Sequence, residues 1–251
     1  MTQHKTLIVI VYAPALVGND RRALAVVHGM EKALPGLRLE WRLSKGGRPI
    51  ALPQRDAWLA ENTVDGGFPI VCNGDASYPV TVNGGERPGL LSPGGQAQFE
   101  VYGELPLDKP VIAAAAAVLE GVAEGARALW GRATPDDAAG DIAYQTAPTL
   151  QGPPSPRRGL PALKLFEHIR SPEIPYYLGW LNYWSAAAAR AIGFPDPARD
   201  AELLSRSRRT ATGGWVVQLT DAPLDLDNPA HLDALKRAYE RFPEIGGRST
   251  P

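Results

Sequence analysis

Three aspartates near the C-terminal end of the chain, Asp221, Asp225 and Asp227, form its best candidate cluster of carboxylates. Side chains of this type at spacings of four and two residues are able to ligate a hard cation such as calcium. The segment lacks the central glycine and the trailing glutamate of an EF-hand loop, and proline and leucine residues separate its acids. This pattern is typical of a turn whose acids cap the end of a strand and the start of a helix. We interpret the three aspartates as such a turn and as a contact surface for a partner, with metal binding and catalysis as the alternatives.

The other side chains that commonly do chemistry are scattered along the chain. The four histidines, His4, His28, His168 and His231, have no ligand spacing with each other, with a cysteine or with clustered acids. The single cysteine, Cys72, excludes an internal disulfide, and the apolar run 68–71 before it predicts a buried thiol. A nucleophilic cysteine needs a histidine base, and none lies near Cys72 in the sequence. The sequence therefore predicts no metal site, no cofactor and no catalytic residue.

The glycine-rich segments do not have the spacing of a phosphate-binding loop. Neither Gly84-Gly85 nor Gly94-Gly95 leads into a Gly-Lys-Ser or Gly-Lys-Thr sequence, and Pro14 follows the first predicted strand where a dinucleotide-binding fold needs a glycine turn. The Gly-x-Ser-x-Gly elbow of many hydrolases is also absent. These observations favour a binding protein. An enzyme that acts on a small ligand or nucleotide, or a structural or regulatory oligomer, stays as an alternative.

The composition is that of an ordinary globular protein. The 251 residues are 44% hydrophobic and 21% charged, with a formal net charge of −1. Since there is no basic surplus, we expect no nucleic-acid partner, and we interpret the cluster of Arg206, Arg208 and Arg209 as a solvated helix end. The apolar run 7–11 is too short for a signal peptide, and no stretch approaches the length of a membrane span. We therefore expect a cytoplasmic protein without a membrane partner, as a monomer or a homodimer.

Aromatic residues gather in the last third of the chain. Tyr176, Tyr177, Trp180, Tyr183 and Trp184 lie within nine residues, and Trp215 follows. If 176–184 is a strand, Trp180 and Trp184 share one face while Tyr177 and Tyr183 share the other. One face belongs to the core, and the other packs under a helix or forms a binding patch. The candidate partner-binding residues are thus Trp180, Tyr183 and Trp215, together with the three aspartates.

Hydrophobic spacing predicts an α+β fold whose mixed, mainly antiparallel sheet has helices packed on it. The chain opens β-α-β, with a strand at 6–13, a helix at 21–34 and a strand at 37–43. Further helices are predicted at 52–64, 108 to about 130, 186–192, 198–208 and from Asn228 onward. Further strands are predicted at 69–72, 78–82, 96–105, 163–166, 176–184 and 214–220. The segment 84–95 is predicted to be a loop. We expect a single domain over 1–251, with two possible lobes at 1–147 and 162–247 joined by a Pro/Gly-rich linker or surface loop at 148–161.

A family resemblance rests on the same C-terminal third. The sequences Gly-Trp-Leu-Asn-Tyr at 179–183, Gly-Gly-Trp-Val-Val-Gln-Leu-Thr at 213–220 and the run from Pro223 to Pro229 resemble the C-terminal half of bacterial immunity proteins. The nearest are the immunity protein 52 group and related type VI immunity families, over roughly 176–241. The whole chain, from 6–9 to 242–247, is also similar to the domain of unknown function 5953.

The immunity resemblance implies an α+β protein that binds a cognate bacterial toxin, often a nuclease, and blocks it. It transfers no catalytic residue, since none is known for such families. It predicts a protein–protein interface in which acids such as Asp221, Asp225 and Asp227 complement a basic surface of the toxin.

Overall fold

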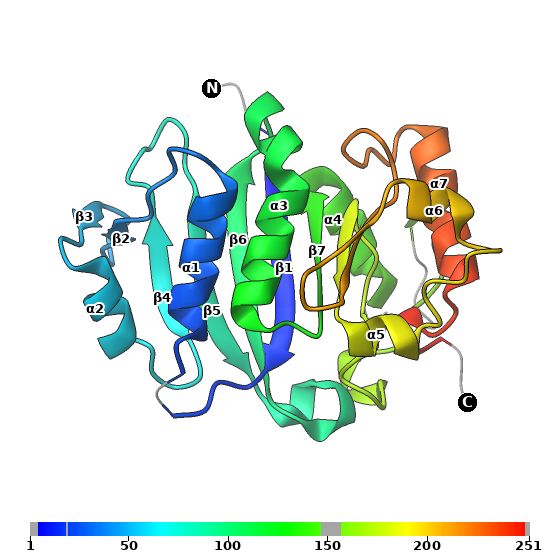
Figure 1. The fold of residues 1–251 in the computed structure, drawn as a ribbon, viewed down its shortest axis with the longest axis horizontal. Coiled ribbons are helices and arrows are strands. Elements are labelled where there is room, and N and C mark those ends of the chain that lie inside the picture. The colour runs from blue at the N-terminus through cyan, green and yellow to red at the C-terminus, as the bar shows by residue number, and fades with distance from the viewer. Residues whose placement is uncertain (1–4, 19, 147–156, 249–251) are drawn as a thin grey trace.

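The computed structural model describes residues 5–18, 20–146 and 157–248, and its centre is one ten-stranded sheet (Figure 1). The strands are β1 (Thr6–Pro14), β2 (Trp41–Leu43), β3 (Pro49–Ala51), β4 (Phe68–Cys72), β5 (Thr81–Arg87), β6 (Gln98–Pro106), β7 (Trp130–Pro135), β8 (Leu181–Trp184), β9 (Arg208–Arg209) and β10 (Trp215–Gln218). Their order is β3-β2-β4-β5-β6-β1-β7-β8-β10-β9. The strand pairings are antiparallel, so the predicted α+β class is confirmed.

Helices cover this sheet unevenly. They are α1 (Arg22–Ala33), α2 (Arg55–Glu61), α3 (Lys109–Ala126), α4 (Asp136–Ala143), α5 (Ala186–Ala191), α6 (Ala201–Ser205) and α7 (Pro229–Arg241). In β1, Leu7, Val9 and Val11 are buried and belong to the same core as the inner sides of α1 and α3. Ile8 and Ile10 alternate with them and lie on the opposite face, half exposed. The predicted strand at 6–13 is therefore confirmed, and the opening β1-α1-β2 follows the predicted order.

The two helices on the front of the sheet, α1 and α3, cross at glycines. A Cβ atom built on Gly121 would lie 2.4 Å from the carbonyl oxygen of Gly29, and one on Gly29 would lie 2.2 Å from that of Gly121. One turn away, a Cβ on Gly125 would lie 2.5 Å from the carbonyl oxygen of Ala25. Gly121 and Gly125, one turn apart, thus let the backbones of α1 and α3 touch. This contact accounts for two glycines in a helix, where glycine is otherwise unfavourable.

The C-terminal third joins the same sheet through β8, which pairs with β7 on one side and β10 on the other. The rings of Trp184, Phe194, Trp215 and Phe242 pack edge to face with one another. Strands from both sides of the predicted linker therefore share one sheet, while the division into two lobes stays a prediction. Most of the linker, 147–156, lies outside the described residues.

Several predicted boundaries differ from the structure. The helix expected to reach Trp130 ends at Ala126, because Arg127 adopts a left-handed conformation (φ 53°) and turns the chain into β7. That strand was not predicted, and neither was α4. The loop expected at 84–95 contributes its first residues to β5, while 163–166 is not a strand and 176–184 is a strand only over Leu181–Trp184.

Replacing Gly121 by alanine tests the helix crossing. Alanine favours a helix, but here its methyl group would overlap the backbone of α1, so we expect Gly121→Ala to lower the free energy of unfolding by about 1–3 kcal/mol. Urea denaturation measures this change.

Gly140→Ala is the matched control, since Gly140 also lies in a helix and a Cβ atom there meets nothing within 4 Å. We expect it to raise stability by up to about 1 kcal/mol. Equal stability of the two variants would show that the crossing does not require glycine.

Candidate binding face of the sheet

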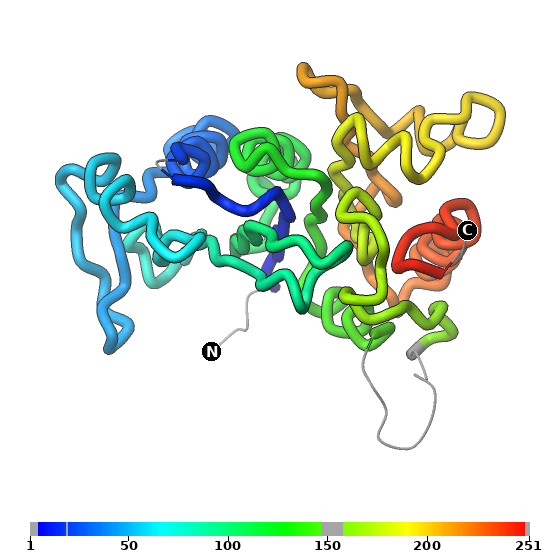
Figure 2. The backbone as a smooth tube through the Cα atoms, turned by 90° about the horizontal axis from the view of Figure 1, so that it is seen from below, coloured from blue at the N-terminus to red at the C-terminus, as the bar shows by residue number. Residues whose placement is uncertain are grey.

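In the described part of the chain, the sheet face opposite α1 and α3 has α4 beside β7 and no helix over β5 and β6 (Figure 2). Figure 2 shows those two helices on one side of the sheet, whereas α4 lies on the other side, next to β7. Strand register places Ile10 beside Tyr102 of β6 and Arg132 of β7 on this face, and Asn83 of β5 beside Tyr102. The side chains here are half-exposed or buried and mostly polar. We call this surface, over β5, β6 and β1, the open face.

A cavity of about 400 Å³ opens between the open face and α4. Its lining is Thr6, Ile8, Ile10, Tyr102, Glu104, Arg132, Asp136 and Ala139. Arg132 is only 5% exposed, its guanidinium lies 4.9 Å from the centre of the Tyr177 ring, and its Nη1 atom has no hydrogen-bond partner. A buried guanidinium with an unused donor is costly to leave unsatisfied. Arg132 is therefore a buried cation whose donors the fold satisfies only in part.

The polar residues of the open face continue along β6 and β5 to Glu100 and Arg87, and we call this row the polar strip. The Arg87 Nη1 atom lies 3.5 Å from Glu100 Oε2, close enough for an ion pair although its hydrogen-bond geometry is poor. Burial raises the pKa of Glu100, and the nearby Arg87 and Arg132 oppose that rise without cancelling it. The guanidinium of Arg87 also stacks over Phe166 at 4.1 Å. The strip combines charge with aromatic surface, which is common in protein interfaces.

A turn before β8 holds the aromatic side of this strip in place. Asn182 is fully buried, its Oδ1 accepts from the backbone nitrogen of Gly179 at 2.9 Å, and its Nδ2 donates to the Gly179 carbonyl at 3.0 Å. A side chain at Gly179 would collide with Thr134, whose Oγ1 lies 2.2 Å from the position of a Cβ. The Gly-x-x-Asn sequence thus carries Tyr176 and Tyr177 across the end of the face, where Tyr176 donates to Gln98 at 2.7 Å.

An acidic rim borders the open face on the side of α4. Arg158 joins Asp141 of α4 to Asp227 of the 221–227 loop, at 2.5 and 2.8 Å, so the loop is fixed against the helix. Lys5 pairs with Asp137 at 2.9 Å, and Asp225 is close enough to contribute to raising the pKa of Lys5. With Asp136 and Glu104 there are six acids, which outnumber the three nearby cations of the described chain, Lys5, Arg132 and Arg158. We define the acidic rim as Glu104, Asp136, Asp137, Asp141, Asp225 and Asp227.

The three predicted aspartates lie in the turn that the sequence indicated. Asp225 Oδ1 accepts from the backbone nitrogen of Asp227 at 2.9 Å, and the backbone nitrogen of Asp225 donates to His231 Nδ1 at 3.1 Å. The next residue, Asn228, caps α7 through a bond from Ala230 at 3.0 Å. All three aspartates are exposed, although Asp221 lies 3.8 Å from Arg206. Their role as a partner contact stays a prediction.

The predicted aromatic residues divide between core and surface. Trp180 and Tyr183 are each 2% exposed. Trp180 donates to the Thr220 carbonyl at 2.9 Å and Tyr183 to Glu124 at 3.0 Å, so their polar atoms are occupied inside the fold. Trp215 is half-buried and packs against Phe194. The aspartates and Trp215 are therefore the predicted residues with accessible surface.

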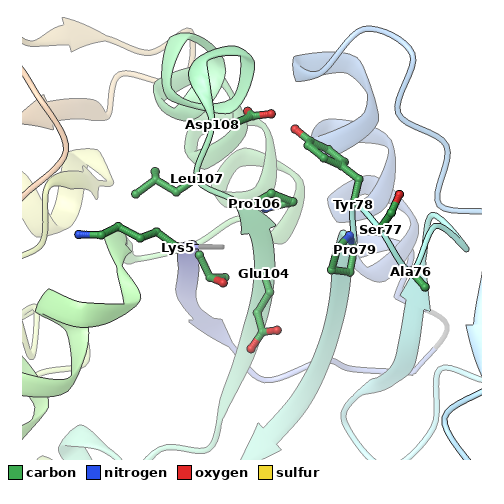
Figure 3. A pocket seen from close by; sticks show the side chains of 10 residues that line it. Lys5, Ala76, Ser77, Tyr78, Pro79, Glu104, Pro106, Leu107 and Asp108 are labelled. Atoms are coloured by element: carbon green, nitrogen blue, oxygen red, sulfur yellow. The ribbon is translucent and has the colours of Figure 1, made fainter. Parts of the chain in front are cut away.

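A second cavity, of about 330 Å³, lies beyond the start of β1 and shares Thr6 and Glu104 with the first (Figure 3). The Tyr78 hydroxyl points toward Asp108, while Lys5 extends away from both. Asp108 already caps α3 by accepting from Val111 at 2.9 Å, and burial together with Asp108 raises the pKa of Tyr78 to about 12. Because these polar groups serve the local structure, this cavity is the weaker candidate.

The sequence did not single out Arg87, Glu100 or Arg132. Arg132 lies in the unpredicted strand β7, and Arg87 in a segment that was predicted as a loop. The one available signal was the alternation at 98–105, whose polar positions form the open side of β6. Over the residues with defined positions, no group of three histidines, cysteines or acids has metal-binding geometry, and no helix is long and apolar enough to cross a membrane.

The titration of Glu100 tests the electrostatics of the open face. Because its pKa is raised in the folded protein, the native state binds this proton more tightly than the unfolded chain does. The resulting stabilisation of the folded protein is complete below the pKa that Glu100 has in the unfolded chain. It is lost as pH rises through the pKa that Glu100 has in the folded protein. We therefore expect the free energy of unfolding of the wild type to fall relative to Glu100→Gln as pH rises from about 4 to 7, in urea titrations. Exposed Glu86→Gln is the control, and a pH-independent difference for Glu100→Gln would contradict the assignment.

Comparison with known proteins places this fold in a family. The model of the domain of unknown function DUF5953 matches residues 18–250. The curated proteins contain no match. Among solved structures, "Pseudomonas aeruginosa T6SS protein PA0821" is similar with a TM-score of 0.54 and 14% identity, over 95% of this chain and 73% of that one, which shows a shared fold. The chain belongs to the DUF5953 family.

Proposed function

We propose that this protein is an immunity protein that binds a cognate bacterial toxin and blocks its active surface. The structural neighbour is named as a protein of the type VI secretion system, abbreviated T6SS, and its fold extends over 95% of this chain. The resemblance of residues 176–241 to type VI immunity families points to the same class of function. Together they favour a binding role within toxin delivery, without catalysis by this chain.

The acidic rim beside the open face is the observation that carries this proposal. Apart from Glu104 of β6, its acids come from α4 and the 221–227 loop, and the salt bridges of Arg158 hold these two segments as one surface. Toxins that act on nucleic acid need a basic surface for phosphate contacts, and an acidic rim complements such a surface. The adjacent open face offers half-buried polar and aromatic groups for closer contact. The mechanism we propose is steric occlusion after electrostatic attraction.

An enzyme that acts on a small ligand is the second candidate. Glu100 favours it, because a buried carboxyl of raised pKa is common in active sites, and Glu100 lies two residues along β6 from Tyr102, which lines the cavity. The two functions differ in what Glu100→Gln does. Loss of toxin neutralisation without any loss of binding would favour the enzyme, whereas unchanged neutralisation would favour the binding protein.

Co-expression with a bacterial toxin whose gene neighbours this one tests the function. We expect growth to be restored, and the two proteins to copurify as a one-to-one complex. Continued toxicity in the presence of the folded protein would contradict the proposal.

Charge reversal tests the rim. Asp137 has 65% of its side chain exposed, and we expect Asp137→Lys to weaken toxin binding by about tenfold, chiefly at low salt, in titration calorimetry. Exposed Glu61→Lys, in α2 at the far end of the sheet, is the matched control. Equal weakening by both variants would place the interface elsewhere.

A further inference from the structure

A small, arginine-rich pocket lies between α6 and α7, apart from the open face. It measures about 180 Å³, and its charged lining is Arg199, Glu202, Arg206, Arg237 and Arg241 over an apolar floor. One glutamate thus faces four arginines, although the whole chain carries a net charge of −1. Such a concentration of like charge in a small concavity is unfavourable unless an anion offsets it.

A buried ion pair fixes the two helices that form the pocket. Asp200, at the start of α6, has a fully buried carboxylate, and Arg241 of α7 donates to it from Nε at 2.6 Å and from Nη2 at 2.9 Å. Arg241 Nη2 also donates to the Gly193 carbonyl at 2.8 Å. This two-pronged contact neutralises Arg241 and sets the separation of α6 and α7. The pocket wall is therefore rigid on this side.

The remaining arginines are only partly neutralised. Arg206 pairs with Glu202 at 2.9 Å and lies 3.8 Å from the exposed carboxylate of Asp221, but its buried Nε has no hydrogen-bond partner. Arg199 and Arg237 are exposed, and neither side chain has an ion-pair or hydrogen-bond partner among the residues placed in the structure. Two guanidinium charges and one buried donor are thus available at the same pocket.

We propose that this arginine pocket binds the phosphate group of a small phosphate monoester or of inorganic phosphate. A phosphate monoester carries a charge of about −1.5 to −2 at pH 7, which matches the two guanidinium groups that lack partners. Its oxygens accept several hydrogen bonds at once, and guanidinium donors are suited to that geometry. A carboxylate would offset only one of the two charges. Of the basic cluster at 206–209, Arg206 lines this pocket, whereas Arg208 pairs with Glu120 of α3.

Titration of the purified protein with sodium phosphate tests the site. At constant ionic strength set with chloride, we expect saturable heat release and a rise in Tm of about 2–4 °C at ten times the Kd. We expect binding to strengthen from about pH 5 to pH 8, because the phosphate gains its second charge while arginine stays protonated.

The double variant Arg199→Gln/Arg237→Gln removes the two groups that lack partners without touching the Asp200–Arg241 pair. We expect its Kd for phosphate to rise at least about tenfold, with the unliganded Tm unchanged within about 2 °C. Arg48→Gln, an exposed substitution in the β2–β3 turn, is the matched control. Equal phosphate binding by the wild type and the double variant, or no saturable binding by either, would overturn the proposal.

Parallel titrations with AMP and adenosine distinguish the sources of the phosphate group. Tighter binding of AMP than of phosphate assigns the pocket to a nucleotide, and equal binding assigns it to the phosphate group alone. Binding of adenosine with the affinity of AMP would overturn a phosphate site. All these titrations use the protein without toxin, so their outcome is independent of neutralisation.

Discussion

The close contact between the backbones of α1 and α3 is the constraint on which the remaining architecture depends. At Gly29 and Gly121 the two helices approach until there is no room for a Cβ atom. Both helices therefore fit side by side over the strands around β1, and together they bury the apolar side of those strands. The reverse side of β5, β6 and β1 carries Ile8 and Ile10 together with polar residues, and α1 and α3 do not cover it (Figure 2).

The parts of the fold that the sequence predicted well have strong local signals. The run 6–13 is nearly all apolar, and the Asn228-Pro229 pair begins α7 as expected, with Asn228 as its cap. The errors fall where long-range packing decides. Arg127 ends α3 in a left-handed conformation that usually requires glycine or asparagine, so no residue at this point indicated that the helix stops and β7 follows. Tyr176 and Tyr177 are typical strand residues, but they precede the turn in which Asn182 bonds to Gly179, and their segment is irregular.

The candidate site was less predictable than the fold. Exposed acids in a turn are visible in a sequence, and residues 221–227 do form that turn. The partners of those acids come from distant segments, because Arg158 and α4 reach them only after the chain has folded. Arg132 gives no local signal, since its burial depends on the ring of Tyr177 some forty-five residues away. The arginines of the α6–α7 pocket are visible in the sequence, but their meeting in one pocket could not be predicted from it.

The two ends of the sheet limit how this protein meets other molecules. The outermost strands, β3 and β9, have three and two residues, and both are exposed. Pro49 opens one of them and two arginines make up the other, so neither offers a long row of free backbone groups. Strand addition at an edge, by which many proteins capture extended peptides or aggregate, is therefore disfavoured at both ends. Side chains, and not backbone pairing, decide which partners this sheet accepts.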